Sequence, residues 1–358
     1  MLQQTDGLRG AYLLPVLVAF PLALTIALIK PSLILPMALG ALVLVVAFLS
    51  PLAGLYALVF SMVLGPEVII GALGEGTTLG RGVTIRFDDL LLVLVGFGWL
   101  GHTAISDGGG RFLRTTLNRP IALYTAACVF ATLMGMLLGQ VRPAGGIFFL
   151  LKYYEYFFLY FMVVNIVSSR DQIRNLVKAS LLTCLLVSLY ALWQIPGGER
   201  VSAPFEGADG EPNTLGGYLV FMMGIVSGLL LIPGAVRQKL PLFGLLGLGI
   251  IALEATLSRT SFLAAGGVVF GVLWVVWRKS TLVLGLLLMS LVIMLFILPT
   301  GVTERVTYTF NQPEEQGQIE VGGLRLDTST SERLRSWQGA LNHFWRSPLW
   351  GAGVTGGP

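Results

Sequence analysis

Long apolar runs recur along nearly the whole chain, and this feature restricts the possible fold more than any other. A helix of about 17 to 25 apolar residues crosses a hydrocarbon core of about 30 Å. Only 12% of the residues are charged, whereas a soluble domain needs about 25% to cover its surface. The sequence therefore predicts an all-α polytopic membrane protein with about eleven transmembrane helices. The predicted spans are 11–29, 33–50, 52–72, 88–104, 120–139, 147–168, 176–195, 215–232, 241–257, 261–277 and 281–299.

The basic residues are distributed unevenly among the loops that connect these spans. One alternating set of loops carries about eleven lysines and arginines, and the short loops of the other set carry about six. The richer set holds Arg9, Arg111, Arg114, Arg119, Arg170, Arg174, Lys178, Arg237, Lys239, Arg278 and Lys279. The positive-inside rule then predicts a cytoplasmic amino terminus. Membrane orientation also accounts for the net charge of +4 without a nucleic-acid partner.

The spans divide the chain into a transmembrane helical domain, residues 1–299, and an extracytoplasmic loop, residues 300–358. The first span follows MLQQTDGLRG without an A-x-A-like cleavage site, so we expect a retained helix rather than a removed signal peptide. An odd number of spans leaves the carboxy terminus outside, where the sequence stops at GAGVTGGP. Either the protein ends in this loop or the sequence is truncated before another helix. The Gly-rich stop favours truncation.

The stretch LEATLSRTSF, residues 253–262, places Arg259 in a short turn between the ninth and tenth spans, at the outer membrane edge. An arginine at this position can extend to phospholipid head groups. It can also hold an anionic lipid-linked substrate, because a guanidinium binds phosphate through two parallel hydrogen bonds. The residues alone leave both interpretations open.

The loop at residues 196–214, PGGERVSAPFEGADGEPNT, lies on the same predicted face of the membrane. It combines Arg200 with the acidic residues Glu199, Glu206, Asp209 and Glu211. The loop enters the next span through Pro212 and Asn213, which can form a turn and a helix cap. A polar, folded loop beside Arg259 would also make a sugar-binding rim.

The carboxy-terminal loop contains STSERLRSWQGALNHFWRSP, which predicts an amphipathic helix near residues 330–346. Ser329 and Glu332 fit a capping box at its start. The apolar stripe at helical spacing consists of Leu334, Trp337, Leu341, Phe344 and Trp345. We expect this helix to lie along the outer membrane surface, with Arg333 and Arg335 projecting from its first turns. A membrane anchor and a site element fit the pattern equally well.

Several other charged residues fall within or beside the predicted spans. Lys152 and Glu155 in LLKYYEYFF are three positions apart, so one helix face can hold them as a neutralising pair. The adjacent tyrosines would allow a polar cavity instead. Asp88 and Asp89 are placed to complement the amino-terminal dipole of the fourth span. Glu254, near the end of the ninth span, is a further intramembrane ionisable group.

The sequence contains no cluster with metal-ligand spacing, no nucleotide-binding glycine motif and no suggested Ser-His-Asp set. His102 and His343 are isolated from each other in the sequence. Nucleotide hydrolysis and metal catalysis are therefore poor explanations for this chain. We expect no cofactor and no metal.

Three motifs follow one another in the second half of the chain. Arg200 precedes EPNTLGGYL at a helix start, TLSRTSFLAAGG follows at a turn, and R-x-R-x-W-x-x-A-L then leads to SPLWGAGVTGG. In this order, over residues 150–358, the sequence resembles the O-antigen ligase and O-antigen polymerase family of bacterial envelope glycosyltransferases.

The resemblance implies a GT-C-like, metal-independent enzyme of the bacterial inner membrane. Such an enzyme takes a glycan from undecaprenyl diphosphate at the outer face and transfers it to a lipid-A core or to another glycan. Its implied partners are this donor, the glycan or lipid-A core acceptor, and membrane lipids. Ligase and polymerase differ in acceptor rather than in donor chemistry, so the sequence does not separate them.

The resemblance also assigns roles to particular residues of this sequence. Arg200 and Arg259 match the family arginines assigned to the diphosphate, while Arg333 and Arg335 match the arginine-bearing helix of the large outer loop. The family's proposed base is a histidine downstream of P-L-x-G-x-G, a position that would follow Pro358. His343 lies upstream and does not fill it, so the catalytic residue is unknown.

A transporter or flippase of lipid-linked saccharides is the alternative function, because it would also need arginines near the bilayer. A flippase should place its charges along a central path through several spans. Most non-cytoplasmic charges of this chain instead gather on one predicted face of the membrane. This asymmetry favours the enzyme.

Overall fold

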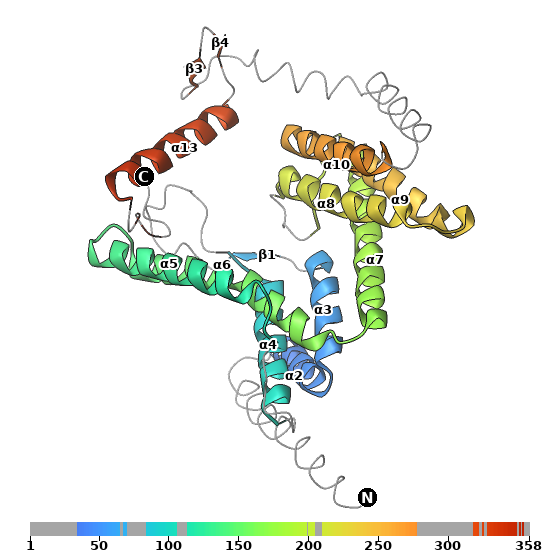
Figure 1. Cartoon of the computed structure of the whole chain (residues 1–358), viewed down its shortest axis with the longest axis horizontal. Helices are drawn as coiled ribbons and strands as arrows, with labels where there is room; N and C mark the ends of the chain where they lie inside the picture. The colour runs from blue at the N-terminus through green and yellow to red at the C-terminus, as the bar shows by residue number, and fades with distance from the viewer. Residues whose placement is uncertain are drawn as a thin grey trace, which may run out of the picture. The chain divides into compact units, whose positions relative to one another are not determined.

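The computed structural model describes residues 34–64, 67–69, 84–105, 113–198, 200–204, 210–277, 318–321, 324–325, 328–348, 351 and 353. Helices dominate these residues (Figure 1). They are α2 (Ile34–Leu49), α3 (Pro51–Leu64), α4 (Phe87–Ile105), α5 (Asn118–Leu137), α6 (Pro143–Ile166), α7 (Arg170–Gln194), η2 (Ile195–Gly197), α8 (Pro212–Leu231), α9 (Val236–Ala255), α10 (Arg259–Trp277) and α13 (Thr328–Arg346). Two short antiparallel ladders pair β1 (Glu67–Ile69) with β2 (Thr84–Arg86) and β3 (Glu320–Val321) with β4 (Leu324–Arg325).

The chain forms two compact units. Unit 1 comprises Met1–Ala179 and Gly339–Pro358, and unit 2 comprises Ser180–Gln338. Helices α7 and α13 each contribute residues to both units.

The core of unit 1 lies where α2, α3 and α4 pack together, with α6 against them. Val95 of α4 and Met162 of α6 are fully buried in this core. Small residues allow the helices to approach closely. A Cβ at Gly54 would lie 2.7 Å from Val95 Cγ1, and one at Gly98 would lie 2.8 Å from Ala47 Cβ. Packing through small residues is typical of helices in membranes, where lipid tails are as apolar as leucine.

The core of unit 2 forms where α8 packs against α9, with the second half of α7 beside them. Its buried residues are Cys184, Met222, Val226 and Leu245. Helix α8 also packs against α10. Helix α8 begins with Pro212, whose missing N–H costs nothing in the first turn of a helix. These contacts align the starts of α8 and α10.

Seven described helices, α4 to α10, are long and apolar enough to cross a membrane, which supports a multi-pass membrane protein. Each corresponds to one predicted span. The predicted spans 33–50 and 52–72 correspond to shorter apolar helices, and the spans 11–29 and 281–299 lie outside the described residues. The predicted number of about eleven is therefore not reached in the described part of the chain. The GT-C-like arrangement and the domain boundary at residue 299 stay predictions.

The predicted span 52–72 is wrong in its second half. Helix α3 ends at Leu64, and Glu67–Ile69 forms the strand β1. The sequence between them is Gly65-Pro66. A proline disfavours helical backbone in the residue before it, which explains why the apolar run does not continue as one helix.

Membrane orientation can be tested at two exposed residues, Gln238 and Ser336. We expect Gln238 in the cytoplasm and Ser336 outside, from the uneven distribution of basic residues. The background should replace Cys128 and Cys184 by serine, because both are free cysteines. An impermeant thiol reagent added to intact spheroplasts should then label Ser336→Cys and leave Gln238→Cys unmodified. The reverse labelling pattern would invert the topology.

Candidate functional site

The turn between α9 and α10 is built around buried hydroxyl groups. Thr256 Oγ1 donates to the Leu253 carbonyl at 2.7 Å and accepts from the Ser258 N–H at 3.2 Å. Leu257 has a φ of 50°, a left-handed conformation that leucine rarely adopts. Ser258 caps α10, because its Oγ accepts the N–H of Ser261 at 3.4 Å. The chain thus reverses between two helices through a strained turn, a feature that is enriched at functional sites.

The first turn of α8 packs against the start of α10. Ser258 Oγ donates to Asn213 Oδ1 at 2.7 Å and lies 2.8 Å from Ser261 Oγ. Gly216 makes this approach possible, because a Cβ there would lie 2.7 Å from the Ser261 Cβ. Two helix amino termini therefore lie together, and each carries a partial positive charge from its peptide dipoles.

The expectation that Pro212 and Asn213 form a cap for this helix is wrong. Glu211 is the residue that precedes α8, and it makes no side-chain cap hydrogen bond. Asn213 lies inside the helix, where its Nδ2 donates to Glu211 Oε1 at 3.1 Å and its Oδ1 accepts from Ser258. Asn213 therefore joins two helices instead of capping one.

Arg200 approaches the same turn from the loop that follows α7. Its Nε donates to the Thr256 carbonyl at 2.9 Å, and the next residue donates its N–H to the Ala255 carbonyl at 3.3 Å. Gln194 fixes this loop, because its amide donates to the Ser202 carbonyl at 2.9 Å and accepts from the Ser202 N–H at 3.1 Å. Arg200 is thus held by its own hydrogen bond to Thr256 and by the contacts of the two residues that follow it.

Arg259 is the first residue of α10 and directly follows the capping residue Ser258. The structure therefore brings Arg200 and Arg259, both predicted from the sequence, to the two sides of one turn. We name the group Arg200, Asn213, Thr256, Ser258 and Arg259 the α8–α10 cluster. The exposed Glu211 contacts this cluster through Asn213. Two guanidinium groups and two helix amino termini make the cluster suited to an anion.

Arg333 and Arg335 lie near the start of α13, and both are exposed. At 3.6 residues per turn, side chains two positions apart point about 160° away from each other. Arg333 flanks the apolar stripe, whereas Arg335 lies on the polar face. The described contacts do not bring either arginine to the α8–α10 cluster.

The expected capping box of this helix is wrong. Helix α13 begins at Thr328, so Ser329 lies inside its first turn. Ser331 is fully buried, and its Oγ accepts the N–H of Ile319 at 3.0 Å. A contact with an earlier segment of the loop thus holds the start of α13, and sequence spacing along the helix does not reveal such a contact.

The apolar stripe of α13 is exposed in the structure: Trp337 is 66% exposed, Leu341 57% and Trp345 75%. A bilayer would cover such a stripe, since Trp and Leu residues favour the boundary between head groups and acyl chains. We expect a spin label at Leu341 to be accessible to oxygen and shielded from a water-soluble nickel reagent. A label at Ser336, on the polar face, should show the opposite pattern. Equal accessibility at the two positions would exclude the membrane-bound helix.

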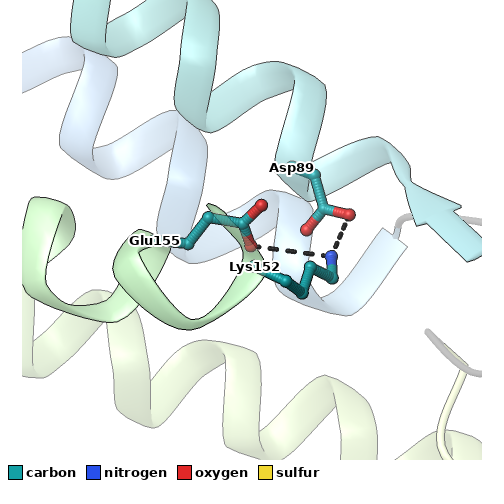
Figure 2. Close-up of polar contacts among 3 residues, drawn as sticks. All are labelled: Asp89, Lys152 and Glu155. Carbon is teal, nitrogen blue, oxygen red and sulfur yellow. Dashed lines mark hydrogen bonds and ion pairs between the residues drawn. The ribbon is translucent and has the colours of Figure 1, made fainter. Parts of the chain in front are cut away.

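Lys152 of α6 pairs with carboxylates on two helices (Figure 2). It contacts Asp89 in the first turn of α4, and its Nζ lies 3.5 Å from Glu155 Oε2 on its own helix. The predicted pairing of Lys152 with Glu155 is confirmed, and so is the position of Asp88 and Asp89 in the first turn of α4. The link between α4 and α6 was missed, because local spacing does not show contacts between helices. We interpret the group as a structural charge pairing.

Sequence reasoning missed the residues that join the starts of α8 and α10. Gly216, Ser258 and Ser261 shape the contact between α8 and α10. A signal for them is present in the sequence, because hydroxyl groups recur in TLSRTS and small residues in NTLGG. Neither motif shows by itself that the two helix starts meet.

Comparison with known proteins gives one match. Residues 243–358 match the family model described as O-antigen ligase. The matched segment covers the last 116 of the 358 residues, so the similarity concerns this part of the chain. It includes Arg259, Arg333 and Arg335, while Arg200 precedes it. No curated protein and no solved structure matches the chain.

Proposed function

We propose that this chain belongs to the O-antigen ligase and polymerase family and is a glycosyltransferase that uses a glycan linked to undecaprenyl diphosphate. The family match supports an enzyme of the glycosyltransferase type. The donor, the acceptor and the inner-membrane location are inferences from the family resemblance and from the chemistry of the site. The acceptor is a lipid-A core or a second glycan.

The α8–α10 cluster is the observation that carries this proposal. It joins Arg200 and Arg259 at one turn, with the amino termini of α8 and α10 beside them. The cluster lies at the ends of apolar helices, as a site for a lipid-linked anion requires. The long prenyl chain of such a donor would stay in the bilayer while its diphosphate reached the turn.

The chemistry follows from the charge of the leaving group. An acceptor hydroxyl attacks the anomeric carbon of the donor glycan, and the bond between that carbon and the diphosphate oxygen breaks. Negative charge grows on the departing diphosphate in the transition state. Guanidinium groups and helix N–H groups held in advance around that charge lower the barrier. A base must accept the proton of the acceptor hydroxyl, and the residue that acts as this base is unknown.

The helix α13 gives the donor a second basic contact in this proposal. Arg333 flanks the stripe that we expect to lie on the membrane, so its guanidinium would remain at head-group level. Arg335 points about 160° away on the same helix, toward the polar face, and cannot bind the phosphate that Arg333 contacts. We therefore propose Arg333 as a contact for donor phosphate or glycan, and Arg335 as a contact for another part of the substrates.

Glycan transfer separates this function from the alternative of a flippase. The full-length protein should be reconstituted in vesicles with a glycan donor on undecaprenyl diphosphate and a defined acceptor. The proposed enzyme releases undecaprenyl diphosphate and lengthens or modifies the acceptor. Movement of intact donor across the bilayer, with no release of undecaprenyl diphosphate, would instead identify a flippase.

A further inference from the structure

A directed chain of hydrogen bonds joins the start of α8 to the start of α10. Glu211 precedes α8, and an ionised carboxylate can only accept hydrogen bonds. Asn213 therefore turns its amide Nδ2 toward Glu211, 3.1 Å from Oε1, and leaves its Oδ1 to face Ser258. The carboxylate thus fixes the orientation of the amide, because a flipped amide would set two oxygen acceptors against each other.

Asn213 in turn sets the direction of the Ser258 hydroxyl. Ser258 has one hydroxyl proton, and it donates this proton to Asn213 Oδ1 at 2.7 Å. Its lone pairs are left to face α10, where they accept the N–H of Ser261 at 3.4 Å and the hydroxyl of Ser261 at 2.8 Å. Ser258 is 1% exposed and Ser261 4%, so a bond lost here leaves a buried polar group unsatisfied. The cap of α10 therefore depends on an amide in α8.

Both arginines of the α8–α10 cluster are connected to Ser258. Arg259 is the next residue in the chain and begins α10. On the other side, the Ser258 N–H donates to Thr256 Oγ1 at 3.2 Å, and Arg200 Nε donates to the Thr256 carbonyl at 2.9 Å. A rotation of Ser258, or a shift of α10 away from α8, would therefore change the spacing of the two guanidinium groups.

We propose that Glu211 and Asn213 are positioning residues for diphosphate binding, and that their hydrogen-bond chain sets the spacing of Arg200 and Arg259. This role rests on the proposed function, which assigns a diphosphate to the α8–α10 cluster. It gives a reason for a carboxylate beside an anion site, where its charge alone would repel the ligand. An acidic residue before a helix also offsets the helix dipole, but that effect requires no contact with Asn213.

The first measurement is the binding of the full-length protein in nanodiscs to undecaprenyl diphosphate and to undecaprenol. The diphosphate preference is the Kd of undecaprenol divided by the Kd of undecaprenyl diphosphate. We expect Asn213→Ala to lower this preference about three- to tenfold, because the cap of α10 loses a hydrogen bond. A variant that is merely unstable would lose affinity for both lipids and keep the preference. The matched control is Thr214→Ala, at an exposed position in the same helix turn, and it should keep the wild-type preference.

The second experiment exchanges the donor and the acceptor between two side chains without changing their lengths. Asn213→Asp should lower the diphosphate preference about three- to tenfold, because two carboxylates then face each other without a donor. Adding Glu211→Gln supplies an amide donor, leaves a carboxylate oxygen to accept from Ser258, and keeps the wild-type charge. This double variant should recover the preference to within about twofold. Glu211→Gln combined with Asn213→Ala removes the same carboxylate without rebuilding the chain, so its preference should stay low.

Hydrogen exchange in the first turn of α10 tests the same chain without any lipid. The Ser261 N–H is protected by its bond to Ser258 Oγ. Asn213→Ala should speed its exchange about three- to tenfold. The double variant Glu211→Gln with Asn213→Asp should restore the wild-type rate.

Three results would overturn the positioning role: unchanged exchange in Asn213→Ala, changed exchange with an unchanged diphosphate preference, or a double variant whose preference stays as low as that of Asn213→Asp. A wild-type protein without any diphosphate preference would refute the proposed function, and the role in diphosphate binding with it. The exchange rates would still decide whether Glu211 and Asn213 hold the start of α10.

Discussion

Arg259→Ala is expected to lower glycan transfer about ten- to a hundredfold in membranes that contain normal amounts of the protein. The reason is the loss of one charge-assisted contact to the departing diphosphate, which is worth about 1.5 to 3 kcal/mol. Arg259→Lys should be impaired nearly as much, because an ammonium cannot make the two parallel hydrogen bonds of a guanidinium. Transfer is measured as undecaprenyl diphosphate released per amount of folded protein.

The matched control for this experiment is Arg237→Ala. Arg237 is an exposed arginine near the start of α9, at the opposite end of that helix from the α8–α10 cluster. Its removal also takes away one positive charge, and we expect normal transfer. If well-expressed Arg259→Ala transferred glycan at the wild-type rate, Arg259 would be an interfacial anchor for phospholipid head groups instead of a substrate contact.

Lys152→Met is expected to cost about 3 to 5 kcal/mol of stability. The substitution leaves Asp89 and Glu155 close together in apolar helices without their shared cation. The side chains are at most 28% exposed, and within a membrane the exposed part would face lipid instead of water. The measurement is the thermal unfolding midpoint of purified protein in detergent, together with the yield of monodisperse protein.

A triple variant serves as the control for the loss of charge balance. Lys152→Met combined with Asp89→Asn and Glu155→Gln removes all three charges, and we expect it to recover most of the lost stability. Replacing a complete buried ion pair is often nearly neutral, whereas removing one partner is strongly destabilising. A single variant Lys152→Met as stable as the wild-type protein would refute the structural role of this group.

Much of the helical fold could be predicted from the sequence, because a membrane span must satisfy its backbone polar groups internally and must be apolar over its length. The predicted spans matching α4 to α10 follow from these two requirements. The prediction was wrong where an apolar run continued past a proline, after Leu64, because hydropathy does not register the loss of helical geometry. Contacts between helices, such as Lys152 with Asp89, depend on packing and leave no periodic pattern.

The candidate site was also predicted from the sequence only in part. Arg200 and Arg259 stand out in the sequence as charges near apolar runs, and the structure brings them to one turn. The residues that join α8 to α10 were not predicted, because Gly216 and Ser261 are common residue types whose importance comes from a close approach. The role of all four arginines in binding substrate stays a prediction, and the described contacts do not connect Arg333 or Arg335 to that turn.

The most direct test of the central claim is the affinity of the purified full-length protein for undecaprenyl diphosphate compared with undecaprenol. Both lipids carry the same prenyl chain, so the ratio of their dissociation constants in nanodiscs isolates the contribution of the diphosphate. We predict that undecaprenyl diphosphate binds more tightly than undecaprenol. The dissociation constant of undecaprenol divided by that of undecaprenyl diphosphate should fall about ten- to a hundredfold in Arg200→Ala and in Arg259→Ala. The ratio should be unchanged in Arg237→Ala. Equal affinity for the two lipids, or a ratio that survives both substitutions in the α8–α10 cluster, would contradict the account.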